Sequence, residues 1–273
     1  MDQIQIKNLE VFAKHGVFPE ENVLGQKFVI SAALYTATRE AGKTDDLTKS
    51  IHYGEISHWI KRFLEEHTYQ LLETAAERLA EELLLQTERL ERVRLQLQKP
   101  WAPIGLHLEA VSVEIERGWH TAYIALGSNM GDKKGYLEMG VEGLRHTRGC
   151  RVEAVSDFLV TEPYGLVEQD KFLNGAMKIR TLLTPHELLD RLNEIEQTAN
   201  RERIVRWGPR TLDLDILLYD DWILDDERLH IPHIEMYKRE FVLEPLCQIA
   251  PYVRHPVWNR TALELLEELK RLR

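Results

Sequence analysis

One stretch organises this sequence: RWGPRTLDLDILL, at residues 206–218. After the Gly-Pro turn signal, strict alternation predicts a strand with four apolar side chains on one face. These are Leu212, Leu214, Ile216 and Leu218. Asp213 and Asp215 then share the opposite face. Two carboxylates so close repel each other unless a positive charge lies between them, so the stretch predicts a site for a cation.

Hard divalent cations prefer carboxylate oxygens, which makes Mg²⁺ the expected guest of Asp213 and Asp215. Because Mg²⁺ usually shares its shell with substrate phosphates, a polyphosphate ligand is implied as well. Four arginines in the preceding loop would bind such phosphates. They are Arg201, Arg203, Arg206 and Arg210. The alternative is a solvated edge strand with surface arginines, since a bare Asp-x-Asp pattern is common.

Length and composition indicate an ordinary globular protein. The 273 residues suit one large or two modest domains. A formal net charge of −10 argues against a nucleic-acid partner. We expect no membrane partner and a cytoplasmic location, because no apolar run is long enough for a membrane span and the first residues lack signal-peptide features. Cys150 and Cys247 are too few and too far apart for a metal site, and we expect reduced thiols.

The first half of the chain predicts a small α+β domain. Period-two alternation indicates strands at residues 4–6, 28–34, 93–98 and 111–115, and apolar spacings of three and four predict two helices between them. The order ββααββ describes a half-buried antiparallel sheet with helices on one side. So small a domain has exposed sheet edges, and we expect it to form homo-oligomers.

Lys99 stands out in this half. Continued alternation places it on the same face as Val93, Leu95 and Leu97, so its ammonium would lie at the end of an apolar stripe. Desolvation lowers a lysine pKa, which suits general acid–base work near neutral pH. The alternative is a lysine at a strand end whose charged head reaches the solvent.

Six short motifs, in order and spacing, resemble dihydroneopterin aldolase over nearly all of residues 1–118. They are HG at 15–16, EEN at 20–22, LGQ at 24–26, HYGE at 52–55, LLE at 71–73 and KP at 99–100. The resemblance implies a tunnelling fold, or T-fold, with no cofactor. It assigns Lys99 as the acid–base residue, assisted by Tyr53 and Glu21. Glu73, beside Leu72, would accept two N–H groups of a pterin ring.

The second half also reads as α+β. A buried strand at residues 122–126 leads into GSNMGD at 127–132, a turn whose small residues allow close backbone approach. A helix near residues 137–144 and strands near 152–160 and 175–181 follow. The capping-box sequence TPHE at 184–187 predicts the start of another helix.

The segment from Trp207 to Leu217 resembles the signature of 6-hydroxymethyl-7,8-dihydropterin pyrophosphokinase, and GSNMGD resembles its opening motif. The resemblance implies a ferredoxin-like domain at residues 119–273 that uses ATP and Mg²⁺, with Arg210 in a catalytic role. The implied pterin site consists of Thr161, Pro163, Gly165, Phe172, Asn174 and Phe241. The implied ATP site consists of Arg201, Arg203, Arg206, Trp207, Arg210, His233 and Arg239. The alternative for both phenylalanines is core packing.

Together the two resemblances predict a bifunctional enzyme of folate biosynthesis. Its first domain would cleave dihydroneopterin to hydroxymethyl-dihydropterin and glycolaldehyde, and its second would transfer pyrophosphate from ATP to the hydroxymethyl group and release AMP. One alternative is a metal-dependent glycosyltransferase, which leaves the first half unexplained. Another is a non-catalytic pterin- or nucleotide-binding module, which would not need Lys99 and both aspartates as a set.

Overall fold

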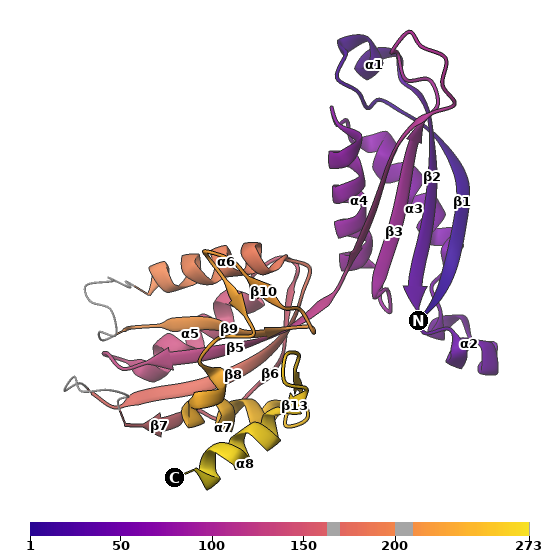
Figure 1. Ribbon diagram of the computed structural model, residues 1–273. Helices are drawn as coiled ribbons and strands as arrows, with labels where there is room; N and C mark the ends of the chain where they lie inside the picture. Colours follow the sequence, from indigo (N-terminus) through magenta and orange to yellow (C-terminus); the bar gives the residue numbers. More distant parts are fainter. Residues whose placement is uncertain (163–169, 200–209, 273) are drawn as a thin grey trace. The chain divides into compact units, whose positions relative to one another are not determined.

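A computed structural model describes residues 1–162, 170–199 and 210–272 of the protein (Figure 1). The chain divides into two compact units, Met1–Trp119 and His120–Arg273. This division lies one residue beyond the boundary expected from the sequence. Within the described ranges, no helix is both long enough and apolar enough to cross a membrane.

The first unit contains one antiparallel sheet with the strand order β1-β2-β3-β4. Its strands are β1 (Asp2–Ala13), β2 (Gln26–Thr36), β3 (Arg92–Lys99) and β4 (Val111–Gly118). Its helices are α1 (Pro19–Leu24), α2 (Arg39–Thr44), the 3₁₀ turn η1 (Leu47–Lys49), α3 (Tyr53–Glu66) and α4 (Leu72–Gln86). The predicted ββααββ order is confirmed, with α1, α2 and η1 as short additions.

The two long helices pack on one face of this sheet, α3 against β1 and α4 against β3 and β4. Alternation along β3 buries Val93, Leu95 and Leu97 completely under α4. The five-residue connection between α3 and α4 makes the helices antiparallel neighbours. As predicted, Lys99 continues the buried stripe and is 9% exposed.

The second unit is built around a five-stranded antiparallel sheet. The order β6-β8-β5-β9, with β7 also paired to β8, is the β-α-β-β-α-β ferredoxin-like arrangement. The central strands are β5 (His120–Ser128), β6 (Cys150–Val155), β7 (Leu159–Thr161), β8 (Phe172–Thr181) and β9 (Asp213–Tyr219). The helices are α5 (Lys133–Arg145), α6 (Pro185–Thr198), the 3₁₀ turn η2 (Met236–Lys238), α7 (Glu240–Ile249) and α8 (Ala262–Arg271). Two small hairpins complete the unit: β10 (Leu224–Asp225) with β11 (His230–Ile231), and β12 (Arg254–His255) with β13 (Arg260–Thr261).

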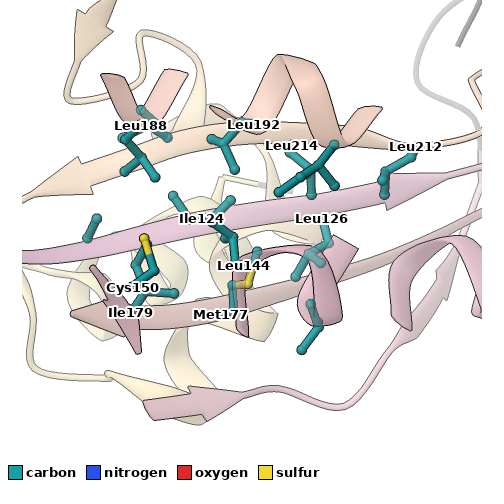
Figure 2. Packing of buried hydrophobic residues seen from close by; sticks show 14 of the residues in the cluster. Ile124, Leu126, Leu144, Cys150, Met177, Ile179, Leu188, Leu192, Leu212 and Leu214 are labelled. Atoms are coloured by element: carbon teal, nitrogen blue, oxygen red, sulfur yellow. The ribbon is translucent and has the colours of Figure 1, made fainter. Parts of the chain in front are cut away.

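This sheet has a core on each face. Helices α5 and α6 cover one face, where Leu188 and Leu192 of α6 lie over Ile124, Leu126 and neighbouring side chains (Figure 2). Helix α7 packs on the other face, and α8 packs on α7. Helix α6 starts with the predicted capping box, in which the hydroxyl of Thr184 accepts the N–H of Glu187.

One detail of β9 differs from the prediction. Leu212, Leu214 and Ile216 lie in the α5–α6 core as expected, but Leu218 lies in the α7 core together with Leu217. The pairing with β5 shifts at this point, so that one extra β9 residue stands opposite β5. Such a bulge reverses the alternation that follows it, which is why the prediction for Leu218 was wrong.

Candidate active sites

The first unit holds a buried ion pair at the end of its sheet. Lys99 Nζ lies 2.5 Å from Glu21 Oε1, and the two residues are 9% and 8% exposed. Glu21 belongs to α1 and also accepts hydrogen bonds from the Phe18 N–H (3.1 Å) and from Gln26 Nε2 (2.8 Å). Two of the three residues expected to carry proton transfer are thus in direct contact.

The environment of Glu21 keeps its carboxylate charged. Burial alone raises the pKa of Glu21, but the hydrogen bonds from Lys99, from the Phe18 N–H and from Gln26 outweigh burial and lower the pKa below its ordinary value. The pair therefore places the amino group of Lys99 beside a charged carboxylate, within reach for proton transfer.

Gly16 makes room for this carboxylate. Its φ of +155° lies in a region that side chains rarely adopt, and a Cβ built on it would approach Glu21 Oε2 to 2.2 Å. The glycine of the HG motif is thus explained by close packing of its backbone against the Glu21 carboxylate.

Glu73 lies at the same end of the unit. It occupies the first turn of α4 and is exposed, beside the half-buried Leu72. The segment before α4 is hydrogen-bonded to the HG motif: the Tyr69 N–H donates to His15 Nδ1 (3.2 Å), and the Gly16 N–H donates to the Tyr69 carbonyl (3.0 Å). Since Gly16 packs on Glu21, the predicted ring-binding residues and the ion pair lie at one end of the fold.

Tyr53 is not brought to this end. It is the first residue of α3 and is 63% exposed, whereas α3 ends just before Tyr69. A helix of 14 residues is about 21 Å long. Within one chain, Tyr53 and Lys99 are therefore separated by roughly the length of α3.

The second unit aligns its predicted site residues across the sheet. Gly127 of β5 is the register partner of both Asp213 in β9 and Asn174 in β8. A Cβ on Gly127 would lie 3.3 Å from Asn174 Oδ1 and 3.7 Å from Asp213 Cβ. Asn174 Nδ2 in turn donates to Thr161 Oγ1 over 2.7 Å. The structure thus brings a predicted metal residue and a predicted pterin residue onto the two strands that flank β5.

Arg210 pairs with the first aspartate. Its guanidinium forms an ion pair with Asp213, and Asp215 projects from the same side of β9. The main chain of Arg210 is fixed by Asn129, whose Oδ1 accepts the Arg210 N–H (2.7 Å). The GSN turn thus positions an arginine beside the carboxylates.

His233 lies beside β9, close enough to Asp213 for the charge of this aspartate to act on its pKa. The main-chain N–H of His233 donates to the Leu217 carbonyl (3.0 Å), and its ring Nδ1 accepts the main-chain N–H of Glu235 (3.2 Å). Burial is the largest cause that lowers the pKa of His233 to about 4; the charge of Arg239 adds to it, while Asp213 and Glu235 oppose it. His233 is therefore neutral at neutral pH.

Arg239 and Phe241 lie at the start of α7. The Arg239 guanidinium sits 5.8 Å from the centroid of the Phe241 ring, a cation–π contact, and 3.8 Å from Glu235. Phe172 starts β8 and is the register partner of Thr161. Both phenylalanines are partly buried, so each keeps a surface that a flat ring could contact.

Six predicted site residues fall outside the described ranges. They are Pro163, Gly165, Arg201, Arg203, Arg206 and Trp207. Within the described residues, no group of three or more His, Cys, Asp or Glu side chains could hold a metal ion.

Glu196 was missed by the sequence reasoning. This α6 residue is 4% exposed, and its Oε1 accepts the N–H of Leu214, the residue between the two aspartates, over 2.7 Å. The available signal was its spacing of four from Leu192 and eight from Leu188, which puts a carboxylate at a core position of the helix.

Comparisons with known proteins match both units. Residues 4–116 match the dihydroneopterin aldolase family, and residues 123–251 match the 7,8-dihydro-6-hydroxymethylpterin-pyrophosphokinase family. The Bacillus subtilis 2-amino-4-hydroxy-6-hydroxymethyldihydropteridine pyrophosphokinase is 48% identical over 132 residues, which are 48% of this chain and 79% of that protein.

Two further relatives match the first unit or the whole chain. The solved E. coli dihydroneopterin aldolase in complex with neopterin is 32% identical, covering 43% of this chain and all of that one, with a TM-score of 0.40. The folic acid synthesis protein FOL1 of Dictyostelium discoideum is 32% identical over 96% of this chain. The chain spans 43% of that protein, less than half of its length.

Proposed function

We propose that this chain, which belongs to the dihydroneopterin aldolase family over residues 4–116 and to the 7,8-dihydro-6-hydroxymethylpterin-pyrophosphokinase family over residues 123–251, catalyses two consecutive steps of folate biosynthesis. One observation carries the proposal: each family match coincides with one compact unit, and each unit assembles described residues suited to its reaction. The first product is the alcohol that the second reaction consumes.

In the first unit, the proposed reaction is the retro-aldol cleavage of 7,8-dihydroneopterin. A base removes the proton from the hydroxyl on the second side-chain carbon, and the bond to the first carbon breaks. Glycolaldehyde leaves, the electron pair moves into the ring as an enamine, and an acid then protonates the first carbon. Lys99 and Glu21, 2.5 Å apart, would carry these protons, while Glu73 accepts two N–H groups of the ring. No cofactor is proposed for this half.

A second copy of the chain would complete this site. Tyr53 lies about one α3 length from Lys99, so it can assist the reaction only if a neighbouring copy supplies it. Strands β1 and β4 are the edges of the sheet, and large apolar side chains near Glu21 and Lys99 are exposed. Examples are Val17, Phe18, Leu24, Trp101 and Leu106. We therefore propose a homo-oligomer formed through this unit.

In the second unit, the pterin alcohol would attack the β-phosphorus of ATP and expel AMP. Asn174 and Thr161 would bind the pterin ring, and Phe172 and Phe241 would stack on it. Pro163 and Gly165 would add backbone contacts. ATP would be bound by His233, Arg239, Arg201, Arg203, Arg206 and Trp207.

Asp213 and Asp215 fit a Mg²⁺ ion. The two carboxylates project from one side of β9, and their combined negative charge favours a divalent cation there. When bound, Mg²⁺ would neutralise phosphate charge. Arg210, held by Asn129, would align the phosphates from the other side.

The test is an assay of the full chain with 7,8-dihydroneopterin, ATP and Mg²⁺. We expect three products: glycolaldehyde, the pyrophosphorylated hydroxymethyl-dihydropterin and AMP. If the protein binds pterin but releases none of these products, it is a non-catalytic binding module instead. We further propose that the protein works in the cytoplasm on small molecules, without nucleic-acid or membrane partners.

A further inference from the structure

His15 lies between the two parts of the first site without having been assigned a role. Its Nδ1 accepts the Tyr69 N–H, and its neighbour Gly16 donates to the Tyr69 carbonyl. The His15 ring also stacks on the Tyr69 ring, with centroids 5.7 Å apart. We call this pair of hydrogen bonds with its ring contact the His15–Tyr69 clamp.

The His15 side of the clamp is buried, and the clamp depends on a neutral ring. His15 is 1% exposed and packs edge-on against Phe28, with centroids 5.1 Å apart. Burial, and then the charges of Lys99 and His67, lower the pKa of His15 to about 4. Nδ1 therefore remains an acceptor at neutral pH, and the network assigns the proton to Nε2. Among the described residues Nε2 has no hydrogen-bond partner, so the acceptor at Nδ1 is the polar contact that matters here.

The clamp touches both functional parts of the site. On one side, Gly16 packs directly on the Glu21 carboxylate. On the other side, Tyr69 precedes the first turn of α4, which carries Glu73. The N-cap residue of α4, Leu71, makes no side-chain capping bond. The position of this turn therefore depends on the segment before it, which the clamp holds.

We propose that His15 is a positioning residue that sets the placement of Glu73 relative to the Lys99–Glu21 pair. The proposal rests on the aldolase function proposed above and deepens it. His15 needs no contact with reacting atoms: it acts through Tyr69 and the first turn of α4. Without the clamp, the pterin ring would bind to a displaced carboxylate. A displacement of about 1 Å can cost about 10²-fold in rate.

Three substitutions separate this role from a packing role. His15→Phe keeps an aromatic ring on Tyr69 but removes the acceptor. His15→Asn places an amide oxygen near the position of Nδ1 and keeps the acceptor. His67→Phe is the matched control, because His67 stacks on the same Tyr69 ring (6.0 Å) while its Nδ1 bonds the Phe63 carbonyl of its own helix.

The experiment uses the full chain. It measures kcat and KM for dihydroneopterin cleavage, the Kd of the fluorescent probe neopterin, which keeps the side chain that the first reaction cleaves, and the folded fraction by circular dichroism. For His15→Phe we expect kcat/KM to fall by about 10- to 10²-fold, with a raised Kd. His15→Asn should stay within about threefold of wild type, a margin smaller than one hydrogen bond is worth, and His67→Phe should match wild type. A packing role would reduce the folded fraction and hence kcat, and would leave KM and Kd unchanged.

Two results overturn the proposal. The first is a folded His15→Phe variant whose KM and Kd equal those of His67→Phe. The second is a folded His15→Asn variant that is as impaired as His15→Phe. If His15→Phe does not fold, His15→Asn alone decides. A Kd of His15→Asn about tenfold above that of wild type then contradicts the clamp. If the wild-type chain does not cleave dihydroneopterin, the proposed aldolase function is refuted instead. The Kd values of the three variants then still test the role of His15.

Discussion

Asn129 and Arg210 exchange two hydrogen bonds: Asn129 Oδ1 accepts the Arg210 N–H over 2.7 Å, and the Asn129 N–H donates to the Arg210 carbonyl over 3.0 Å. Asn129 is 1% exposed and 81 residues distant in sequence. In the proposed function, the GSN turn would therefore act on phosphate chemistry indirectly, by fixing the arginine that pairs with Asp213.

Asn129→Ala should weaken pyrophosphoryl transfer. The change leaves the partly buried Arg210 N–H without its Asn129 acceptor, which costs about 1–3 kcal/mol of stability, and lets the guanidinium move. We expect AMP release to fall by at least about tenfold while glycolaldehyde release is unchanged. Steady-state assays of both products check this. An unaltered rate of AMP release would show that the GSN turn does not contribute to the reaction.

Lys99→Ala should remove most aldol cleavage. Loss of one positioned acid–base group typically costs about 10²- to 10⁴-fold in rate. Pterin affinity should remain, because Glu73 and not Lys99 is assigned the ring edge. The pKa of Glu21 should also rise, since the hydrogen bond from Lys99 helps to lower it. Single-turnover cleavage measures the loss of rate, and probe binding measures the retained pterin affinity. Cleavage at the wild-type rate would show that Lys99 has a structural role only.

Mixed oligomers should test the shared site. If each site combines Lys99 of one copy with Tyr53 of another, chains carrying Lys99→Ala and chains carrying Tyr53→Ala are each nearly inactive alone. After unfolding and refolding together in equal amounts, about a quarter of the sites should contain both natural residues. Cleavage should recover accordingly. A mixture no more active than its separate components would place Tyr53 and Lys99 in different roles.

Stability should depend on pH through His15. Its pKa is lowered from 6.5 to about 4 in the folded state, so the unfolded chain binds more protons between these values. Folding is therefore favoured above pH 6.5, and about 3 kcal/mol is lost as pH falls to 4. Glu21 adds a loss of the same sign below its ordinary pKa of 4.5. Urea unfolding of wild type and His15→Phe at pH 4–7 checks this, and equal slopes would contradict it.

The sequence predicted those features that arise from local periodicity. Alternation in β3 placed Lys99 at the end of a buried stripe, and the TPHE motif marked the start of α6. Leu218 was misplaced because a bulge is set by pairing with β5 and leaves no mark in the alternation itself. Contacts such as Asn129 with Arg210 or His15 with Tyr69 join distant segments, so only the folded chain reveals them.

The site residues show the same limit. The family resemblance grouped Tyr53 with Lys99 because it assigns both to one reaction, but it carries no information on whether one chain can bring the two side chains together. Glu196 was overlooked because its role is fixed by the β9 backbone that it contacts. Glu73 and Lys99 lie at one end of the unit, where α4 begins and β3 ends.

The most direct test of the two-site account is product analysis of Asp213→Asn with 7,8-dihydroneopterin, ATP and Mg²⁺. The amide keeps the size of the side chain but weakens a hard-cation ligand and the pairing with Arg210. We predict normal release of glycolaldehyde, accumulation of 6-hydroxymethyl-7,8-dihydropterin and almost no AMP. Loss of both activities in a folded protein, or AMP release at the wild-type rate, would contradict the account.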